Sequence, residues 1–142
     1  MPAPPVVLDT NVFVAAGFNQ RSASARLLEE VRSSRLPMVW NEDTRRETRH
    51  ILEKIPPLSW PSVAPRFRDD NRFDGPTHPE KFSHIPDADD RKFAALAEAA
   101  GAIIVTNDEH LLQGRDRANI EILTPDEFSS RIRGKLGGGR SM

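Results

Sequence analysis

The chain has 142 residues, of which 37% are hydrophobic and 29% are charged, and its formal net charge is -1. This length suits one domain with a single core, and the near-zero charge provides no global basic field that would attract nucleic acid. The absence of cysteine excludes disulfides and thiolate metal sites. No apolar run approaches the roughly 20 residues that a membrane span needs, and the opening MPAPP lacks the features of a signal peptide, so we expect a cytoplasmic protein without a membrane partner.

The first part of the chain predicts two strands, each followed by a helix. Residues 6–9, VVLD, are β-branched and apolar and follow prolines, which predicts a strand. Apolar residues recur at spacings of three and four within 22–34, which predicts a helix. PMVW at 37–40 predicts a second strand. A second helix is expected over 44–54, where Pro56 and Pro57 stop it.

Residues 56–86 have a different character. They contain seven prolines, several arginines and little periodicity. This composition predicts a loop-rich stretch with a short helix around 64–70. A long irregular segment inside a compact domain is often functional.

Regular patterning returns in the last third of the chain. Residues 89–100 predict the clearest helix, with Gly101 as its C-cap. AIIVT at 102–106 is apolar throughout, as expected of a strand that is covered on both faces. IEIL at 120–123 predicts a fourth strand. TPDE at 124–127 is a capping box that opens a last helix.

Strands that alternate with helices predict a parallel α/β sheet. We expect a single domain over 1–134 and a flexible, glycine-rich tail over 135–142. In such sheets, ligands bind outside the carboxyl ends of the strands. Those ends are therefore the places where a functional site is expected.

Acidic residues occur at these strand ends and at the starts of the predicted helices. In a parallel sheet, a helix that returns to the bottom of a strand has its own N-terminus at the top, beside the strand ends. The acids in such positions are Asp9, Glu47, Asp87, Asp89, Asp90 and Asp108. Carboxylates that gather at one sheet edge repel each other, and a divalent cation relieves that repulsion.

The types of these residues indicate which metal would bind. Oxygen ligands without His or Cys favour Mg²⁺ or Mn²⁺ over zinc, and the four histidines lack a zinc-site spacing. Such a site activates a water molecule and stabilises charge on a phosphoryl group. Asn11 and Thr106 are candidates to hydrogen-bond the carboxylates.

Each acid also has an ordinary interpretation. Asp87, Asp89 and Asp90 are placed where an Asp caps a helix. Glu47 lies in a charge run that suits a solvated helix face, and Asp108 suits a turn. Asp9 is the hardest to explain in this way, because an unpaired charge beside apolar sequence is costly, and the prediction depends on the whole set.

Four segments resemble the PIN-domain nucleases, most closely the bacterial branch of toxins from toxin–antitoxin pairs. VVLDTNVFVAA at 6–16 resembles the opening strand of that family, and DADDRKFAALAEAAGAIIVTNDEHLL at 87–112 resembles its central signature. ILTPDEF at 122–128 is similar to the closing strand and helix. ETRHIL at 47–52 is similar to the acid-bearing helix start. Together they cover nearly the whole chain except 56–86.

The resemblance implies a three-layer α/β/α sandwich around a central parallel sheet, and an endoribonuclease that hydrolyses RNA phosphodiester bonds with Mg²⁺ or Mn²⁺. It implies RNA and a cognate antitoxin protein as partners, and it admits a homodimer. The catalytic and metal-binding residues that carry over are Asp9, Glu47, Asp90 and Asp108, with Asn11, Thr106 and Asp87 beside them. The helix register favours Asp90 over Asp89. The family suggests five strands, whereas the sequence predicts four.

Basic and aromatic residues near these acids are candidates for RNA contacts. Next to Glu47 they are Arg45, Arg46 and Arg49; in the loop-rich stretch they are Arg66, Arg68 and Arg72; and the stacking candidates are Trp40, Phe67, Phe73 and Phe82. Exposed charges and buried aromatics are the ordinary alternatives.

Two other functions remain open. The first is a catalytically silent PIN-like module that acts through a protein or RNA interface, although all four motif positions are acidic, which favours the enzyme. The second is a phosphotransfer domain of the receiver or phosphatase kind. A phosphatase of that kind needs an acid where this chain has Asn11, and no late lysine follows a strand as in a receiver.

Overall fold

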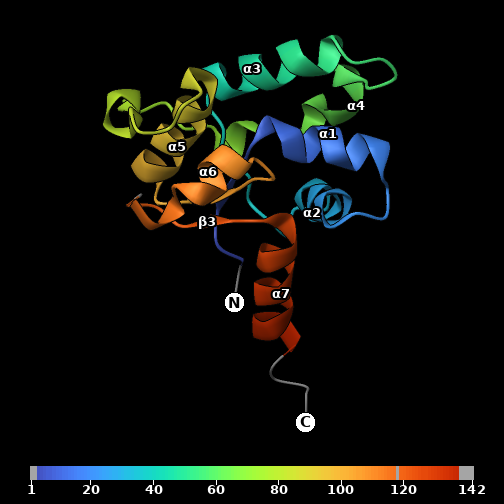
Figure 1. Cartoon of the computed structure of the whole chain (residues 1–142). Coiled ribbons are helices and arrows are strands. Elements are labelled where there is room, and N and C mark those ends of the chain that lie inside the picture. The colour runs from blue at the N-terminus through green and yellow to red at the C-terminus, as the bar shows by residue number, and fades with distance from the viewer. Residues whose placement is uncertain (1–2, 118, 138–142) are drawn as a thin grey trace.

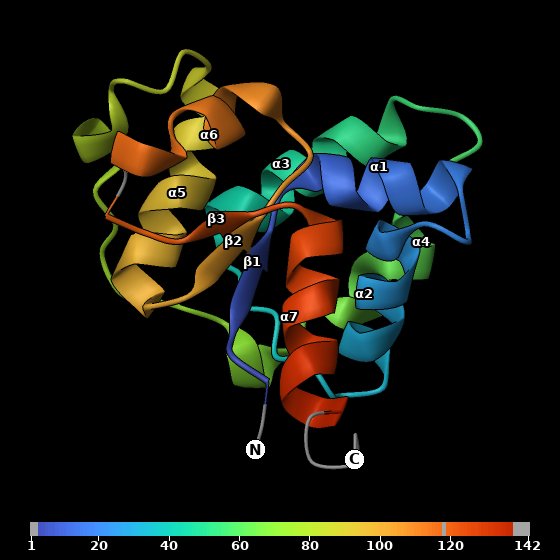
Figure 2. The same ribbon diagram turned by 60° about the horizontal axis from the view of Figure 1, so that its bottom comes forward.

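The centre of the molecule is a parallel sheet of three strands, seen in a computed structural model that describes residues 3–117 and 119–137. The strands are β1 (Val6–Leu8), β2 (Ile103–Val105) and β3 (Ile122–Leu123), in the spatial order β1-β2-β3. Val7 pairs with Ile104, and Val105 pairs with Leu123. All three carboxyl ends therefore meet at one edge (Figure 2).

The described helices surround this sheet. They are α1 (Thr10–Phe18), α2 (Ala23–Arg32), α3 (Glu42–Glu53), α4 (Trp60–Val63), α5 (Ala88–Ala100), α6 (Glu109–Gln113) and α7 (Pro125–Gly137). The predicted helices at 22–34, 44–54 and 89–100 are confirmed as α2, α3 and α5. Gly101 ends α5 in the left-handed conformation, with a φ of 65°.

The two faces of the sheet carry separate apolar clusters. Val6, Leu8 and Val105 pack with α1, α2 and α7, whereas Val7 and Ile104 pack with α5. Successive strand residues point to opposite faces, so a strand covered on both sides is apolar throughout. Figure 2 shows α5 and α6 on one side of the strands and α2 and α7 on the other. The predicted α/β/α sandwich is confirmed.

The predicted strand at 37–40 is wrong as a strand, although the segment does lie beside β1. The Val6 N–H donates to the Pro37 carbonyl at 3.0 Å, and the Val39 N–H donates to the Val6 carbonyl at 2.8 Å, which makes a single bridge. Proline provides no N–H for further pairing. A second single bridge joins Trp40 to Arg72, so a fifth extended segment lies inside the loop-rich stretch.

Residues 56–86 are packed onto the body of the protein. They contain α4 and three short 3₁₀ turns at 64–66, 69–71 and 79–82, so the predicted short helix around 64–70 is replaced by two separate turns. Trp60 and Phe82, which lie in α4 and in the last of these turns, are buried. This stretch lacked helical periodicity because it contributes single anchors to the core.

The C-terminal helix α7 contacts α2 and β3 and extends below the sheet in Figure 1. It continues to Gly137, three residues into the segment 135–142 predicted to be a flexible tail. Residues 138–142 lie outside the described part of the chain. Of the helices described, none is both long and apolar enough to span a membrane.

Candidate metal centre

Three carboxylates meet at the carboxyl edge of the sheet. Asp9 follows β1, Asp108 follows β2, and Asp90 lies in the first turn of α5. One oxygen from each of the three lies within 4.8 Å of those of the other two. Asp9 and Asp90 are buried, with exposed fractions of 4% and 8%. The parallel topology thus brings together three acids that are far apart in the sequence.

Thr106 connects two of these acids. Its hydroxyl donates to Asp9 Oδ2 at 2.6 Å and accepts the Asp108 N–H at 2.9 Å. The Asp9 N–H in turn donates to the Val105 carbonyl at 3.1 Å. The ends of β1 and β2 are therefore joined through one buried side chain, and Asp9 and Asp108 have little freedom to move.

Asp108 and Asp90 are oriented by the starts of their helices. Asp108 is the N-cap of α6, where its Oδ1 accepts the N–H of His110 at 2.7 Å. Asp87 is the N-cap of α5, where its Oδ1 accepts the Asp89 N–H at 2.9 Å. Asp90, one position further, is buried beside Asp9, whereas the side chain of Asp89 is 63% exposed. The cap thus sets which of the two neighbouring acids faces the strand ends.

Burial and mutual repulsion raise the pKa of both buried acids. Burial raises the pKa of Asp9 to about 6, although the hydrogen bond from Thr106 acts in the opposite direction. Burial, followed by the charges of Asp9 and Asp108, raises the pKa of Asp90 to about 8. Three ionised carboxylates at this spacing are therefore unstable without a positive charge between them.

The residues at this position fit a divalent cation. Asp90 Oδ2 is buried and has no hydrogen-bond partner among the described residues. A lone carboxylate oxygen in such a position is costly, and a cation would satisfy it. The cluster provides oxygen ligands alone, which suits Mg²⁺ or Mn²⁺.

These acids line a cleft of about 230 Å³, which we call the acidic cleft. That volume is several times the roughly 30 Å³ that one water molecule occupies in the liquid, so a hydrated ion fits. The described residues that line it are Asp9, Thr10, Asn11, Val14, Glu47, Ile51, Asp87, Asp89, Asp90, Phe93 and Asp108.

Glu47 borders the acidic cleft but lies outside the cluster of three. It projects from α3, its side chain is 16% exposed, and its Oε1 lies 3.5 Å from the ammonium nitrogen of Lys92. Sequence reasoning missed Lys92. Its position three residues after Asp89 on the same helix was the available signal, and the two side chains do form an ion pair at 3.6 Å.

The predicted neighbours of the acids have different partners. Thr106 hydrogen-bonds a carboxylate, as expected. Asn11 accepts the N–H of Asn107 through its Oδ1 at 3.1 Å, so it fixes the loop that leads from β2 to Asp108. Asp87 caps α5 and also borders the acidic cleft.

The three arginines predicted beside Glu47 point in different directions. The Arg45 guanidinium lies 5.2 Å from the ring centroid of Trp60, and that of Arg49 lies 5.9 Å from the same centroid. Arg46 instead lines a small cleft together with Glu47. The structure therefore brings Arg46 to the site and holds Arg45 and Arg49 against an aromatic ring.

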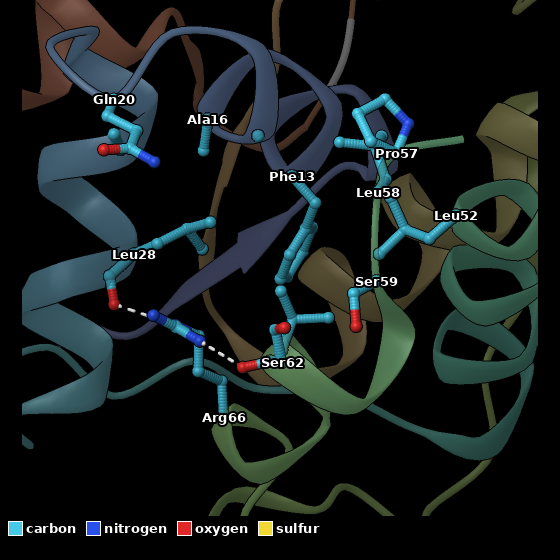
Figure 3. Close-up of a pocket in the computed structure, with 13 residues that line it drawn as sticks. Phe13, Ala16, Gln20, Leu28, Leu52, Pro57, Leu58, Ser59, Ser62 and Arg66 are labelled. Carbon is cyan, nitrogen blue, oxygen red and sulfur yellow. Dashed lines mark hydrogen bonds between the residues drawn. The ribbon is translucent and has the colours of Figure 1, made fainter. Parts of the chain in front are cut away.

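The arginines of the loop-rich stretch have structural contacts. Arg66 donates to the carbonyls of Leu28 and Ser62 at 3.1 and 3.0 Å, in the wall of a separate cavity of about 400 Å³ beside α1, α2 and α4 (Figure 3). Arg68 donates to the Arg32 carbonyl and the Ser34 hydroxyl, and Arg72 pairs with Asp74. The described lining of this cavity contains no carboxylate side chain.

The aromatic residues proposed for base stacking belong mainly to the core. Trp40 and Phe82 are buried, and Phe67 stacks on Phe13 with ring centroids 5.7 Å apart. Phe73 packs against the cluster that contains α5. The ordinary alternative, burial of aromatic side chains, describes them better than stacking on RNA.

Several solved structures share this fold, PAE2754 and FitAB among them. PAE2754 from Pyrobaculum aerophilum is 16% identical, with a TM-score of 0.56, and the match covers 92% of each chain. FitAB, in its structure bound to an IR36 DNA fragment, is 17% identical, with a TM-score of 0.53, over 84% of this chain and 94% of that one. No curated protein matches the sequence. A family model described as the PIN domain matches residues 5–110, so the chain belongs to the PIN-domain family.

Proposed function

We propose that this protein is a metal-dependent endoribonuclease that hydrolyses RNA phosphodiester bonds. PIN domains are generally nucleases. The observation that carries the proposal is the cluster of Asp9, Asp90 and Asp108, whose oxygens lie within 4.8 Å of one another, with a buried, unpaired oxygen on Asp90. An arrangement so costly without a cation is best explained by a site that binds one.

In this proposal, Asp9, Asp90 and Asp108 hold Mg²⁺ or Mn²⁺, and Glu47 borders the same cleft. A cation held there would lower the pKa of a water molecule and offset the charge that develops on the phosphate. Thr106 keeps Asp9 and Asp108 in register through its two hydrogen bonds. Glu47 would accept a proton from the attacking water, whose oxygen forms a new bond to phosphorus. The bond from phosphorus to the leaving ribose oxygen breaks, and that oxygen takes up a proton from solvent.

The first test is RNA cleavage in Mg²⁺, in Mn²⁺ and in EDTA. We expect cleavage with either metal and none in EDTA. Asp9→Asn and Asp90→Asn should each reduce the rate by about 100-fold or more, because each removes a charged ligand of the cation that offsets the charge developing on the phosphate. Asp70→Asn is the control, since Asp70 is exposed in a 3₁₀ turn.

Two results of this assay would speak against the proposal. Cleavage that persists in the double variant Asp9→Asn with Asp90→Asn would reject this site as the source of activity. RNA binding without cleavage in any metal would instead support the catalytically silent binding module.

We further propose that the enzyme is the toxin of a toxin–antitoxin pair, with a cognate antitoxin as its protein partner. The proposal is supported by the motifs at 6–16 and 87–112, which resemble that branch of the family. Expression should arrest growth of the host cell, and co-expression with the protein encoded next to it should restore growth. Growth arrest by Asp9→Asn that equals arrest by the wild type would contradict a nuclease toxin. A cytoplasmic location and a homodimer stay predictions.

A further inference from the structure

A second cleft lies on the other side of Glu47. It has a volume of about 220 Å³ and is lined by Asp43, Arg46, Glu47, His50 and Lys92. Among these described lining residues, two carboxylates balance two permanent cations, and we call it the basic cleft because it contains those cations. Glu47 also borders the acidic cleft, so the two clefts share one side chain as a wall. A strand of nucleic acid that lies in the acidic cleft and passes Glu47 therefore enters the basic cleft.

The acidic cleft cannot attract RNA by itself. Six carboxylates and no cationic side chain are found among the described residues that line it. One or two divalent cations leave a negative balance there, and an RNA backbone carries one negative charge per phosphate. Binding of a polyanion therefore needs positive side chains close to the acids.

The basic cleft provides these groups from two helices. Arg46 and His50 lie one turn apart on α3, so they share a face, and Lys92 faces them from α5. Among the described residues, Arg46 and Lys92 are the permanent cations that line either of these two clefts. Arg45 and Arg49 are held against Trp60 instead.

Lys92 retains capacity for a further ligand. Its ammonium nitrogen lies 3.5 Å from Glu47 Oε1 and 3.6 Å from Asp89 Oδ1, both longer than the roughly 2.7–2.9 Å of a strong charge-assisted hydrogen bond. An ammonium group carries three donors. Arg46 is similarly loose, because its contact with Asp43 is 3.4 Å long and its side chain is 73% exposed.

We propose that the basic cleft binds the RNA phosphodiester that neighbours the one being cleaved. Lys92 and Arg46 are its anion ligands, and His50 donates a hydrogen bond from its ring. This inference rests on the proposed function and adds to it the direction in which the RNA backbone leaves the acidic cleft.

The test measures RNA binding apart from cleavage. Asp90→Asn protein is titrated in EDTA with a fluorescent single-stranded RNA at several salt concentrations. Adding Lys92→Gln or Arg46→Gln should each weaken binding about five- to tenfold and reduce the slope of log K against log salt by about 0.7. Lys54→Gln is the matched control, because Lys54 is exposed at the C-cap of α3. It should change affinity less than twofold.

Two further variants separate a phosphate contact from its alternatives. Lys92→Arg keeps the charge and should keep most of the affinity, whereas a misfolded site would lose it. Lys92→Gln leaves the Glu47 carboxylate without its ammonium partner. Adding Glu47→Gln to Lys92→Gln removes that carboxylate. If that change restores the affinity and slope of the Asp90→Asn reference protein, the loss came from an exposed Glu47 charge, and the phosphate subsite is overturned.

The other outcomes of the binding assay decide whether the basic cleft binds phosphate, independently of whether the protein cleaves RNA. Equal affinity and equal salt slope in all variants, or no RNA binding by the reference protein, would overturn the subsite. Cleavage by the wild-type protein in Mg²⁺ is scored separately. The protein can therefore prove to be a nuclease whose basic cleft does not bind phosphate. It can equally prove to bind RNA through the basic cleft without cleaving it.

Discussion

Asp90 is the residue whose environment is least favourable without a cation. Its carboxylate is buried beside Asp9 and Asp108, and one of its oxygens lacks a hydrogen-bond partner among the described residues. In EDTA at pH 8, Asp90→Asn should therefore raise the free energy of unfolding by about 0.5–2 kcal/mol. Denaturant titration measures this, with Asp70→Asn as the control. A loss of stability would mean that the charge at position 90 is satisfied within the protein.

The pKa shifts of Asp9 and Asp90 predict how metal-free stability changes with pH. Both pKa values are raised in the folded protein, to about 6 and about 8, from an ordinary value near 4. Between these limits the folded protein binds more protons than the unfolded chain, so stability falls as pH rises from 5 to 8. Saturating Mn²⁺ should remove this fall. The double variant Asp9→Asn with Asp90→Asn lacks both carboxylates and should not show this fall. If the wild type and the double variant have the same pH dependence of stability in EDTA, the pKa shifts are contradicted.

At the scale of elements, Thr106 couples the end of β2 to the end of β1. Thr106→Val keeps the shape of the side chain but removes the donor to Asp9 and the acceptor for the Asp108 N–H. We expect a loss of about 1–3 kcal/mol in the free energy of unfolding. Mn²⁺ affinity should fall by about 10–100-fold, which calorimetry measures. Thr77→Val should change neither quantity, because the Thr77 hydroxyl makes no hydrogen bond within the part of the chain that the structure describes.

Local spacing predicted α2, α3 and α5 because caps and apolar stripes act within one element, but it did not predict α1 or α6. Ser22, Asn41 and Asp87 each accept a backbone N–H at the start of their helix, and the sequence shows such signals directly. The extended segments near 38 and 72 were harder to predict, since each is paired by a single bridge between distant parts of the chain. Their pairing depends on tertiary packing.

In the candidate site, too, some features could be predicted from the sequence and others depend on tertiary packing. Asp9, Asp90 and Asp108 could be inferred because strand ends in a parallel sheet meet at one edge, and the structure brings these three together. The directions of Arg45, Arg46 and Arg49 could not be inferred. They depend on where Trp60 lies, and Trp60 belongs to a stretch without periodicity. Lys92 was missed because its partner Glu47 is on another helix.

At the scale of the whole molecule, the residues that form the core and the residues of the candidate site lie in different parts of the fold. Apolar layers on both faces hold the three strands, and the polar residues of the site gather at one edge. The cavity bordered by Arg66 lies on a different part of the surface and includes none of the three clustered acids. The site therefore depends on the carboxyl edge of the sheet and on the starts of α5 and α6.

The measurement that tests the central claim most directly is the location of bound Mn²⁺ in crystals by anomalous scattering. The account predicts an anomalous peak enclosed by the carboxylates of Asp9, Asp90 and Asp108, at roughly 2.0–2.2 Å from their oxygens. The peak should disappear in Asp90→Asn crystals soaked identically. A peak elsewhere on the protein with none between these three acids, at millimolar Mn²⁺, would contradict a metal-dependent site at this edge of the sheet.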